Sequence, residues 1–148
     1  DEDTSIGSAS SKYITKTITL ADSLDAEDLK VFLTAYRPPG TTIEVYARML
    51  SESDSDPLDQ KPWTELTGAA SNPVSQNTNR FDFKEHTFNL PTSVGVTGSA
   101  FLNSDVFQYT DGNFKASSFK YFAIKVVLKG ASFHRVPRLR DLRAIALA

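Results

Sequence analysis

The chain has 148 residues and a mass of 16.3 kDa, the size of one domain with a single hydrophobic core. Hydrophobic residues make up 40% and charged residues 23%, and the formal net charge at pH 7 is −2, so the composition is that of a globular protein rather than a disordered one. Cysteine is absent, which excludes disulfides and thiolate zinc sites, and no apolar run approaches the roughly 18 residues of a membrane helix.

Residues 1–11 are small and polar apart from Ile6. Such a segment buries too little apolar surface to offset the entropy lost on ordering, so it is predicted to be a flexible N-terminal segment. Its acidic start does not have the pattern of a signal peptide. The rest of the chain, residues 12–148, is predicted to form one domain.

The first ordered element is a predicted strand over residues 12–20. Hydrophobic and polar side chains alternate there, with Ile14, Ile18 and Leu20 on one face. A period of two in a segment rich in β-branched residues is typical of a half-buried strand.

Two further alternating segments, 29–36 and 43–49, surround a turn. Pro38 and Pro39 end the first segment because proline has no backbone donor. Pro39 and Gly40 suit the central positions of a type II turn, since glycine adopts a positive φ without strain. We expect the two strands to pair as a β-hairpin.

The next segment, residues 51–62, is an acidic loop, followed by a short strand over residues 63–66 that begins with the only tryptophan, Trp63. The acidic side chains of the loop are Glu52, Asp54, Asp56 and Asp59. Oxygen ligands at alternating positions resemble a calcium loop, but the glycine and the closing glutamate of such a loop are missing. A solvated acidic loop is the alternative interpretation.

Four more strand signals follow. In residues 80–90 the aromatic positions change phase, which predicts a β-bulge near Glu85. Residues 106–110 form a brief strand before a hairpin turn at Asp111 and Gly112. Residues 119–129 have the strongest alternation and should supply the central core strand, and residues 139–148 are predicted to form a strand or a short helix.

About eight short strands separated by turns indicate an all-β protein. Each strand has one apolar face to bury, and two packed antiparallel sheets bury all of these faces. The predicted fold is an antiparallel β-sandwich of jelly-roll type.

The sequence offers no clear reaction centre. His86 and His134 lie far apart and in no metal-binding spacing, and no phosphate-binding or nucleophile motif occurs. Paired carboxylates for glycoside hydrolysis could come from Glu44, Glu65, Asp82 and Glu85. With 18 acidic residues such pairs arise easily. We therefore expect no enzyme activity, no catalytic residue, no cofactor and no metal.

The C-terminal part of the chain is basic, because residues 115–148 contain eight bases and one acid. Four arginines lie close together there: Arg135, Arg138, Arg140 and Arg143. They could bind a polyanion, grip the carboxylates of a neighbouring subunit, or protect a strand edge from aggregation. The subunit contact is the preferred functional interpretation, and we expect no nucleic acid partner.

Aromatic residues also fall on or near polar faces of the predicted strands: Tyr13, Phe32, Tyr36, Tyr46, Trp63 and Tyr121. Exposed aromatics stack on sugars or form protein interfaces, and otherwise they pack under loops. Tyr36, Tyr46 and Trp63 are the preferred docking residues on this aromatic outer face.

Several stretches resemble a structural module of tailed-bacteriophage virion proteins, found in tail, baseplate and fibre components. They are YITKTITLADSLDAEDLKVFLTAYRPPGTTIEVYARML, KPWTEL, FKYFAIKVVLKG and VPRLRDLRAIALA. The resemblance implies a non-enzymatic virion structural protein that assembles with copies of itself and other virion proteins. It would be assembled in the host cytoplasm, with no membrane partner. The alternative function is a carbohydrate-binding module for a host surface glycan.

Overall fold

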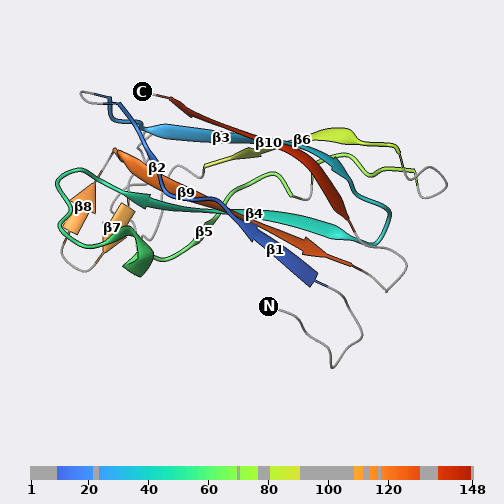
Figure 1. The fold of residues 1–148 in the computed structure, drawn as a ribbon, viewed down its shortest axis with the longest axis horizontal. Helices are drawn as coiled ribbons and strands as arrows, with labels where there is room; N and C mark the ends of the chain where they lie inside the picture. The colour runs from blue at the N-terminus through green and yellow to red at the C-terminus, as the bar shows by residue number, and fades with distance from the viewer. Residues whose placement is uncertain are drawn as a thin grey trace.

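The computed structural model of the chain describes residues 10–21, 24–69, 71–76, 81–90, 109–111, 114–116, 118–130 and 137–147. These residues form ten strands and one turn of 3-10 helix, η2 (Leu58–Gln60) (Figure 1). The strands are β1 (Ser10–Ile14), β2 (Ile18–Thr19), β3 (Asp28–Tyr36), β4 (Thr42–Leu50), β5 (Thr64–Glu65), β6 (Lys84–Asn89), β7 (Tyr109–Asp111), β8 (Phe114–Ala116), β9 (Tyr121–Lys129) and β10 (Arg138–Leu147). The prediction of an all-β protein is confirmed.

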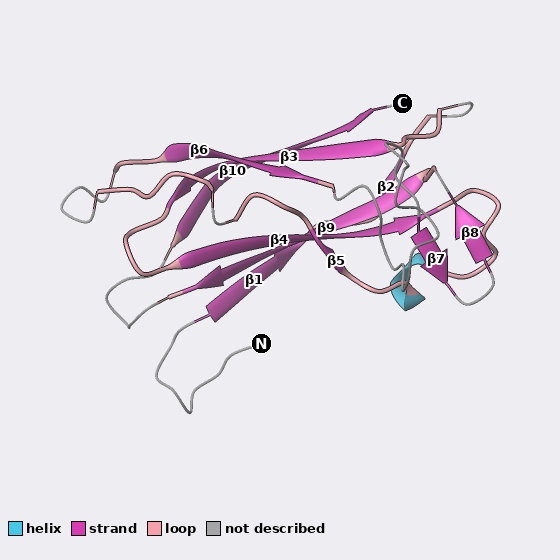
Figure 2. Cartoon of the chain, turned by 180° about the vertical axis from the view of Figure 1, so that it is seen from behind, coloured by secondary structure: helices cyan, strands magenta, loops and turns pink. Residues whose placement is uncertain are grey.

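The strands form two main antiparallel sheets. Sheet I has the order β1-β9-β4-β5, with β2 also paired to β9, and sheet II has the order β10-β3-β6. The short strands β7 and β8 pair with each other. Figure 2 shows β3, β6 and β10 as one layer and β1, β4 and β9 as another. The architecture is therefore sandwich-like.

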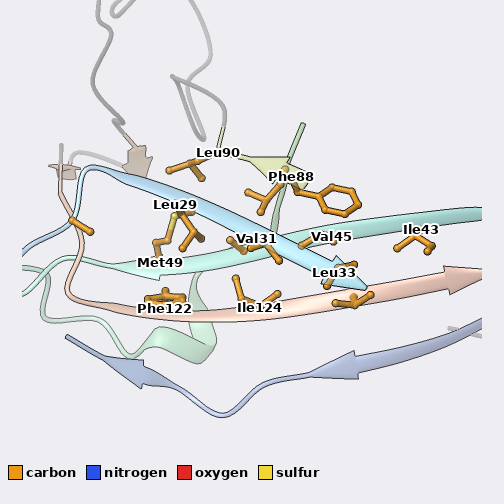
Figure 3. Packing of buried hydrophobic residues seen from close by; sticks show 14 of the residues in the cluster. Leu29, Val31, Leu33, Ile43, Val45, Met49, Phe88, Leu90, Phe122 and Ile124 are labelled. Atoms are coloured by element: carbon orange, nitrogen blue, oxygen red, sulfur yellow. The ribbon is translucent and has the colours of Figure 1, made fainter. Parts of the chain in front are cut away.

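The hydrophobic core lies between the two sheets and follows the alternation of each strand. In β3 and β4 buried side chains occupy every second position. Figure 3 shows core side chains from β3, β4, β6 and β9 gathered in one cluster. Its members on these four strands include Leu29, Val31, Leu33, Ile43, Val45, Phe88, Phe122, Ile124 and Val126. Burial of these apolar surfaces supplies the main free energy of folding.

The predicted hairpin between residues 29 and 49 is wrong, although its turn is present. Thr41 N donates to the Pro38 carbonyl at 3.2 Å, and Gly40 has φ of 82°, as a type II turn requires. However, β3 pairs with β10 and β6, whereas β4 pairs with β9 and β5. The turn thus connects two sheets, because both strands have an apolar face and these faces pack against each other.

The predicted strand over residues 12–20 is divided into β1 and β2. Ile14 lies opposite Lys125, whereas Ile18 lies opposite Phe122, so the register slips by one residue between the two strands. The slip places Ile14 on the outer side of sheet I, where it is exposed, and Ile18 on the core side. The prediction that both face the core is therefore wrong for Ile14. Residues 1–9 of the predicted flexible segment lie outside the described residues, and β1 already begins at Ser10.

The bulge predicted near Glu85 is also wrong, because β6 pairs with β3 in one unbroken register. Phe81 and Phe83 both precede β6 and lie outside the core cluster, so the direction of their side chains does not have to match the alternation that buries Phe88. The bulge occurs in β10 instead, where the register shifts between Leu139 and Asp141. An inserted residue of this kind bends the strand and changes where the next side chains point.

The last strands agree with the sequence patterns. β9 lies between β1 and β4, and Phe122, Ile124 and Val126 on its inner face are almost fully buried. Residues 138–147 form a strand, so the helical alternative is wrong. The hairpin of β7 and β8 is present, although its turn residue Gly112 lies outside the described residues.

Among the described residues, no helix has the length and hydropathy needed to span a bilayer.

Candidate docking surfaces

Three of the four predicted arginines lie together on the outer side of sheet II. Arg138 is opposite Tyr36 and Arg143 is opposite Phe32, and both pairs point away from the core because the alternate residues of β3 are buried. The bulge in β10 places Arg140 within reach of the same side. We call this surface the arginine face; it consists of Arg138, Arg140, Arg143, Phe32, Tyr36 and Phe83. Arg135 lies outside the described residues.

The first half of the arginine face is a stack of guanidinium groups on aromatic rings. The Arg138 guanidinium carbon is 5.0 Å from the centroid of Tyr36 and 5.5 Å from that of Phe83, and the Arg140 carbon is 5.0 Å from Phe83. The Tyr36 and Phe83 rings are 6.2 Å apart. Cations over aromatic faces are attracted by the ring quadrupole. The rings therefore hold both arginines close to the sheet.

The second half of the arginine face is built around Arg143. Its Nη2 donates to Glu85 Oε2 at 3.0 Å, and its guanidinium carbon lies 5.5 Å from the Phe32 ring centroid. Asp141 Oδ2 is 3.9 Å from Arg143 Nε. The Arg143 and Glu85 side chains are both more than half exposed, so this ion pair adds little to stability. Its main effect is to orient the guanidinium group.

A second aromatic surface lies on the outer side of sheet I. The Arg48 guanidinium carbon is 4.1 Å from the Trp63 ring centroid, and Lys125 Nζ is 4.9 Å from the same ring and 4.6 Å from the Tyr46 ring. We call Arg48, Tyr46, Trp63 and Lys125 the tryptophan cluster. Burial, with Lys12 and Arg48 nearby, lowers the pKa of Lys125. This is expected where a cation lies among rings and like charges.

An acidic group borders the tryptophan cluster. Lys129 Nζ lies 2.8 Å from Glu44 Oε1, and the Tyr46 hydroxyl donates to the same carboxylate at 3.2 Å. Glu44 raises the pKa of Lys129 by accepting its hydrogen bond and by its charge. Burial raises the pKa of Tyr46, and the charges of Glu44 and Glu65 raise it further. Tyr46 therefore stays protonated at neutral pH and acts as a hydrogen-bond donor.

The structure does not bring Tyr36, Tyr46 and Trp63 together as one aromatic face. Tyr36 belongs to the outer side of sheet II, whereas Tyr46 and Trp63 belong to the outer side of sheet I, and the core lies between them. Only the arginines and Tyr36 lie on the same side of one sheet, and Tyr36 itself is buried, with 8% of its surface exposed and the Arg138 guanidinium over its ring. That Phe83 and Glu85 join this surface could not be predicted from the sequence, because their position depends on the pairing of β6 with β3.

We expect a Trp63→Ala substitution to leave the fold intact and to lower the free energy of unfolding by about 1–2 kcal/mol. Trp63 is only partly buried, so the loss consists mainly of its contacts with Arg48 and Lys125. Urea denaturation followed by far-UV circular dichroism measures the change. As a control, Trp63→Phe retains a ring and should cost roughly half as much; equal costs would exclude stabilisation by the cations.

The residues considered for catalysis are spread over different parts of the protein. Glu44 and Glu65 lie near Tyr46 on sheet I, whereas Asp82 and Glu85 lie on the side of sheet II. Asp82 accepts a hydrogen bond from Gln76 N at 2.8 Å, which together with Lys84 holds its pKa low. His86 is completely buried in the core, and His134 lies outside the described residues.

The acidic loop encloses a cation supplied by the protein itself. Lys61 Nζ lies 2.5 Å from Asp54 Oδ2 and 3.2 Å from Asp56 Oδ2. The side chains of Lys61 and Asp54 are 2% and 4% exposed. The predicted solvated acidic loop is therefore correct only in part, because the Asp56 side chain is 55% exposed whereas Asp54 is buried against Lys61. Within the described residues no group of three metal-ligating side chains converges.

Comparisons with protein-family models, curated protein sequences and solved structures give no match for this chain. The two surfaces are consequently interpreted from their own geometry.

Proposed function

We propose that the protein is a non-enzymatic structural protein of a tailed-phage virion that docks onto other proteins through its arginine face. Its partners are copies of itself and other virion proteins of the tail, baseplate or fibre region. The phage setting is suggested by the sequence resemblance. The docking role is supported by the arrangement of Arg138, Arg140 and Arg143 on one side of sheet II.

The arginine face suits a partner that presents carboxylates. A guanidinium group binds a carboxylate through two parallel hydrogen bonds, and it tolerates partial burial better than an ammonium group does. Arg138 and Arg140 lie over Phe83, which restricts their side chains before any partner binds. Such restriction reduces the entropy lost on docking. Aromatic residues and arginine are also the residue types enriched at protein interfaces.

The proposal of a non-enzymatic role is supported by two of the acidic residues considered for catalysis, because each already binds a side chain of the protein. Glu44 binds Lys129 and Tyr46, and Glu85 binds Arg143.

We also propose that the sandwich has jelly-roll topology. The position of β9, between strands from the first third of the chain, favours it.

The test is a charge reversal on the arginine face. Sedimentation equilibrium of the wild-type chain is expected to show self-association that weakens with salt, because exposed charges are screened. An Arg138→Glu, Arg140→Glu double variant should weaken this association by roughly tenfold or more while the far-UV spectrum stays the same. The matched control is Lys16→Glu, Lys129→Glu, which changes the net charge equally outside this face. An assembly that both variants weaken equally, or a wild-type chain that is monomeric at all concentrations, would contradict self-docking.

A carbohydrate-binding module is the second candidate, and Trp63 and Tyr46 on sheet I are the residues that favour it. Sugars stack on free aromatic faces. Arg48 and Lys125 lie over these rings, so a glycan would have to displace them or bind the remaining face. Because Trp63 is the only tryptophan, its fluorescence reports binding directly. Saturable quenching by a surface glycan that Tyr46→Ala weakens, while the Trp63 fluorophore stays in place, would favour this candidate over docking.

A further inference from the structure

Sheet I extends beyond sheet II along one side of the sandwich. Tyr13 lies opposite Val126 and Ser11 opposite Leu128 in the pairing of β1 with β9. Residues directly opposite each other point to the same side of a sheet, so Tyr13 and Ser11 point to the side that faces sheet II. Tyr13 is nevertheless 54% exposed. Among the described residues, no strand of sheet II covers this part of β1.

A groove occupies the uncovered place. It has a volume of about 570 Å³ and lies between β1 and β9 on one side and β10 on the other. Its apolar lining comes from Tyr13, Val126, Leu128, Leu139 and Leu142. Leu139 and Leu142 point inward, because they lie opposite the buried residues Ala35 and Leu33, yet both are only partly buried.

The groove is bordered by a strand edge. β10 is the outermost strand of sheet II, and among the described residues its only strand partner is β3. The outer edge of such a strand presents unpaired backbone donors and acceptors. Adjacent strands in a sheet lie about 4.8 Å apart. A strand that paired with the outer edge of β10 would therefore lie in the groove, facing β1.

We propose that this edge groove binds an extended segment of a partner protein, which adds to sheet II as a fourth strand beside β10. The inference deepens the proposed docking function and rests on it. Apolar side chains at every second position of the added strand would contact Leu139, Leu142 and Tyr13. Backbone hydrogen bonds to β10 would supply affinity, and the pockets for alternate side chains would supply specificity.

The charges on β10 indicate which residues should occupy the outward-pointing positions of the added strand. The outward-pointing side chains of β10 include three arginines, of which Arg138 and Arg143 lie on either side of a single acid, Asp141. Opposite charges on neighbouring strands attract, and like charges repel. The outward positions of the added strand should therefore be acidic. The partner segment thus alternates between apolar and acidic residues.

A segment fits this place better than a second folded copy does. β1 of sheet I lines the groove together with β10, so it lies next to the place of the added strand. If the β10 strands of two copies paired side by side, β1 of one copy and β9 of the other would compete for the same space. A single extended segment brings no second sheet with it.

The experiment uses the whole chain labelled with ¹⁵N and a synthetic nine-residue peptide of alternating valine and glutamate with blocked ends. We expect the peptide to shift the amide resonances of residues 10–14 and 138–147. A peptide of alternating valine and lysine should bind at least roughly tenfold more weakly. Ser11→Trp fills the groove with an indole and should weaken binding of the glutamate peptide by a similar factor, whereas Lys16→Trp, an exposed position outside the lining, should not.

Several outcomes would overturn the inference. They are failure of the glutamate peptide to bind, equal binding of both peptides, and binding that Ser11→Trp leaves unchanged. A second groove variant, Tyr13→Asp, gives the same test if Ser11→Trp does not fold. Self-association that Ser11→Trp abolishes would make a second copy the occupant and would also overturn it. Because Ser11→Trp leaves the arginine face unchanged, failure here is distinguishable from failure of the Arg138→Glu, Arg140→Glu test.

Discussion

Replacement of Lys61 by methionine is expected to lower the free energy of unfolding by about 3–5 kcal/mol, the range typical of removing one partner of a buried ion pair. Lys61 Nζ and the Asp54 carboxylate are almost completely shielded from water and 2.5 Å apart. Methionine preserves most of the side-chain volume, so the loss reflects charge rather than a cavity. Without the ammonium group, the buried Asp54 carboxylate loses the charge that offsets its desolvation. Urea denaturation at pH 7 measures the change.

Two companion variants separate the buried pair from the exposed one. Asp56→Asn removes the other carboxylate near Lys61, but that carboxylate is 55% exposed, so the cost should stay below about 1 kcal/mol. Adding Asp54→Asn to Lys61→Met should restore part of the lost stability, because no buried charge then remains. If Lys61→Met costs no more than Asp56→Asn, the pair is solvated and the loop is not organised around Lys61.

The acidic loop illustrates how far sequence alone could predict a site. Four acids in one loop suggested either a calcium ion or open solvent. The lysine that two of them contact is only a few residues further along the chain, in KPWTEL, and the hydrogen bonds of Lys61 N to Leu58 O and Gln60 N to Pro57 O turn the chain back at η2. A local charge pattern does not reveal which side chain a turn will bring back.

The strands themselves were largely predictable, but their partners were not. Alternation in residues 29–36, 43–49 and 119–129 correctly identified β3, β4 and β9 and their buried faces. The turn at Pro39 and Gly40 was also correctly predicted. A turn of this type is compatible both with a hairpin and with a crossing between sheets. The choice depends on whether the two apolar faces pair along their edges or pack face to face, which is a nonlocal property.

The candidate surfaces, like the strands, were predictable where they depend on neighbouring residues in the sequence and unpredictable where they depend on strand pairing. The arginines of β10 could be recognised as a cluster because they are close in sequence. The aromatic residues could not be assigned to one surface, since Tyr36 and Tyr46 have the same alternation in strands of different sheets. Phe83 joins the arginine face only because β6 pairs with β3 and the bulge turns Arg140 toward it. Neither register nor a bulge can be read from side-chain period alone.

The other large effect concerns His86, a histidine enclosed by the core. It lies opposite Leu33 on the inner side of sheet II and is fully buried. Neither ring nitrogen has a hydrogen-bond partner among the described residues. Burial, together with the charge of Arg37, lowers the pKa of His86 to about 4. Arg37 is held in place by hydrogen bonds from its guanidinium group to the carbonyls of Thr41, Ala69 and Asn72.

Protonation of His86 in the unfolded chain should therefore make the protein sensitive to acid. The unfolded histidine binds a proton near its ordinary pKa of about 6.5, whereas the folded one does so only near 4, so the unfolded state binds more protons between these values. Above about pH 6.5, His86 does not reduce the free energy of unfolding. As the pH is lowered toward 4, protonation of His86 in the unfolded state lowers this free energy by about 3 kcal/mol in total. Urea denaturation midpoints measured across this range test the expectation.

The decisive comparison is His86→Leu, which replaces the ring with an apolar side chain of similar size. Its free energy of unfolding should not show this share of the pH dependence, and at pH 7 it should equal or exceed that of the wild type, because two buried nitrogens without partners are removed. His134→Leu removes the other histidine and is the matched control. Carboxylates such as Asp82 titrate in all three proteins, so their contribution cancels in the difference. If His86→Leu loses stability toward pH 4 as steeply as the wild type, His86 is hydrated or paired in the folded protein, and the acid sensitivity has another source.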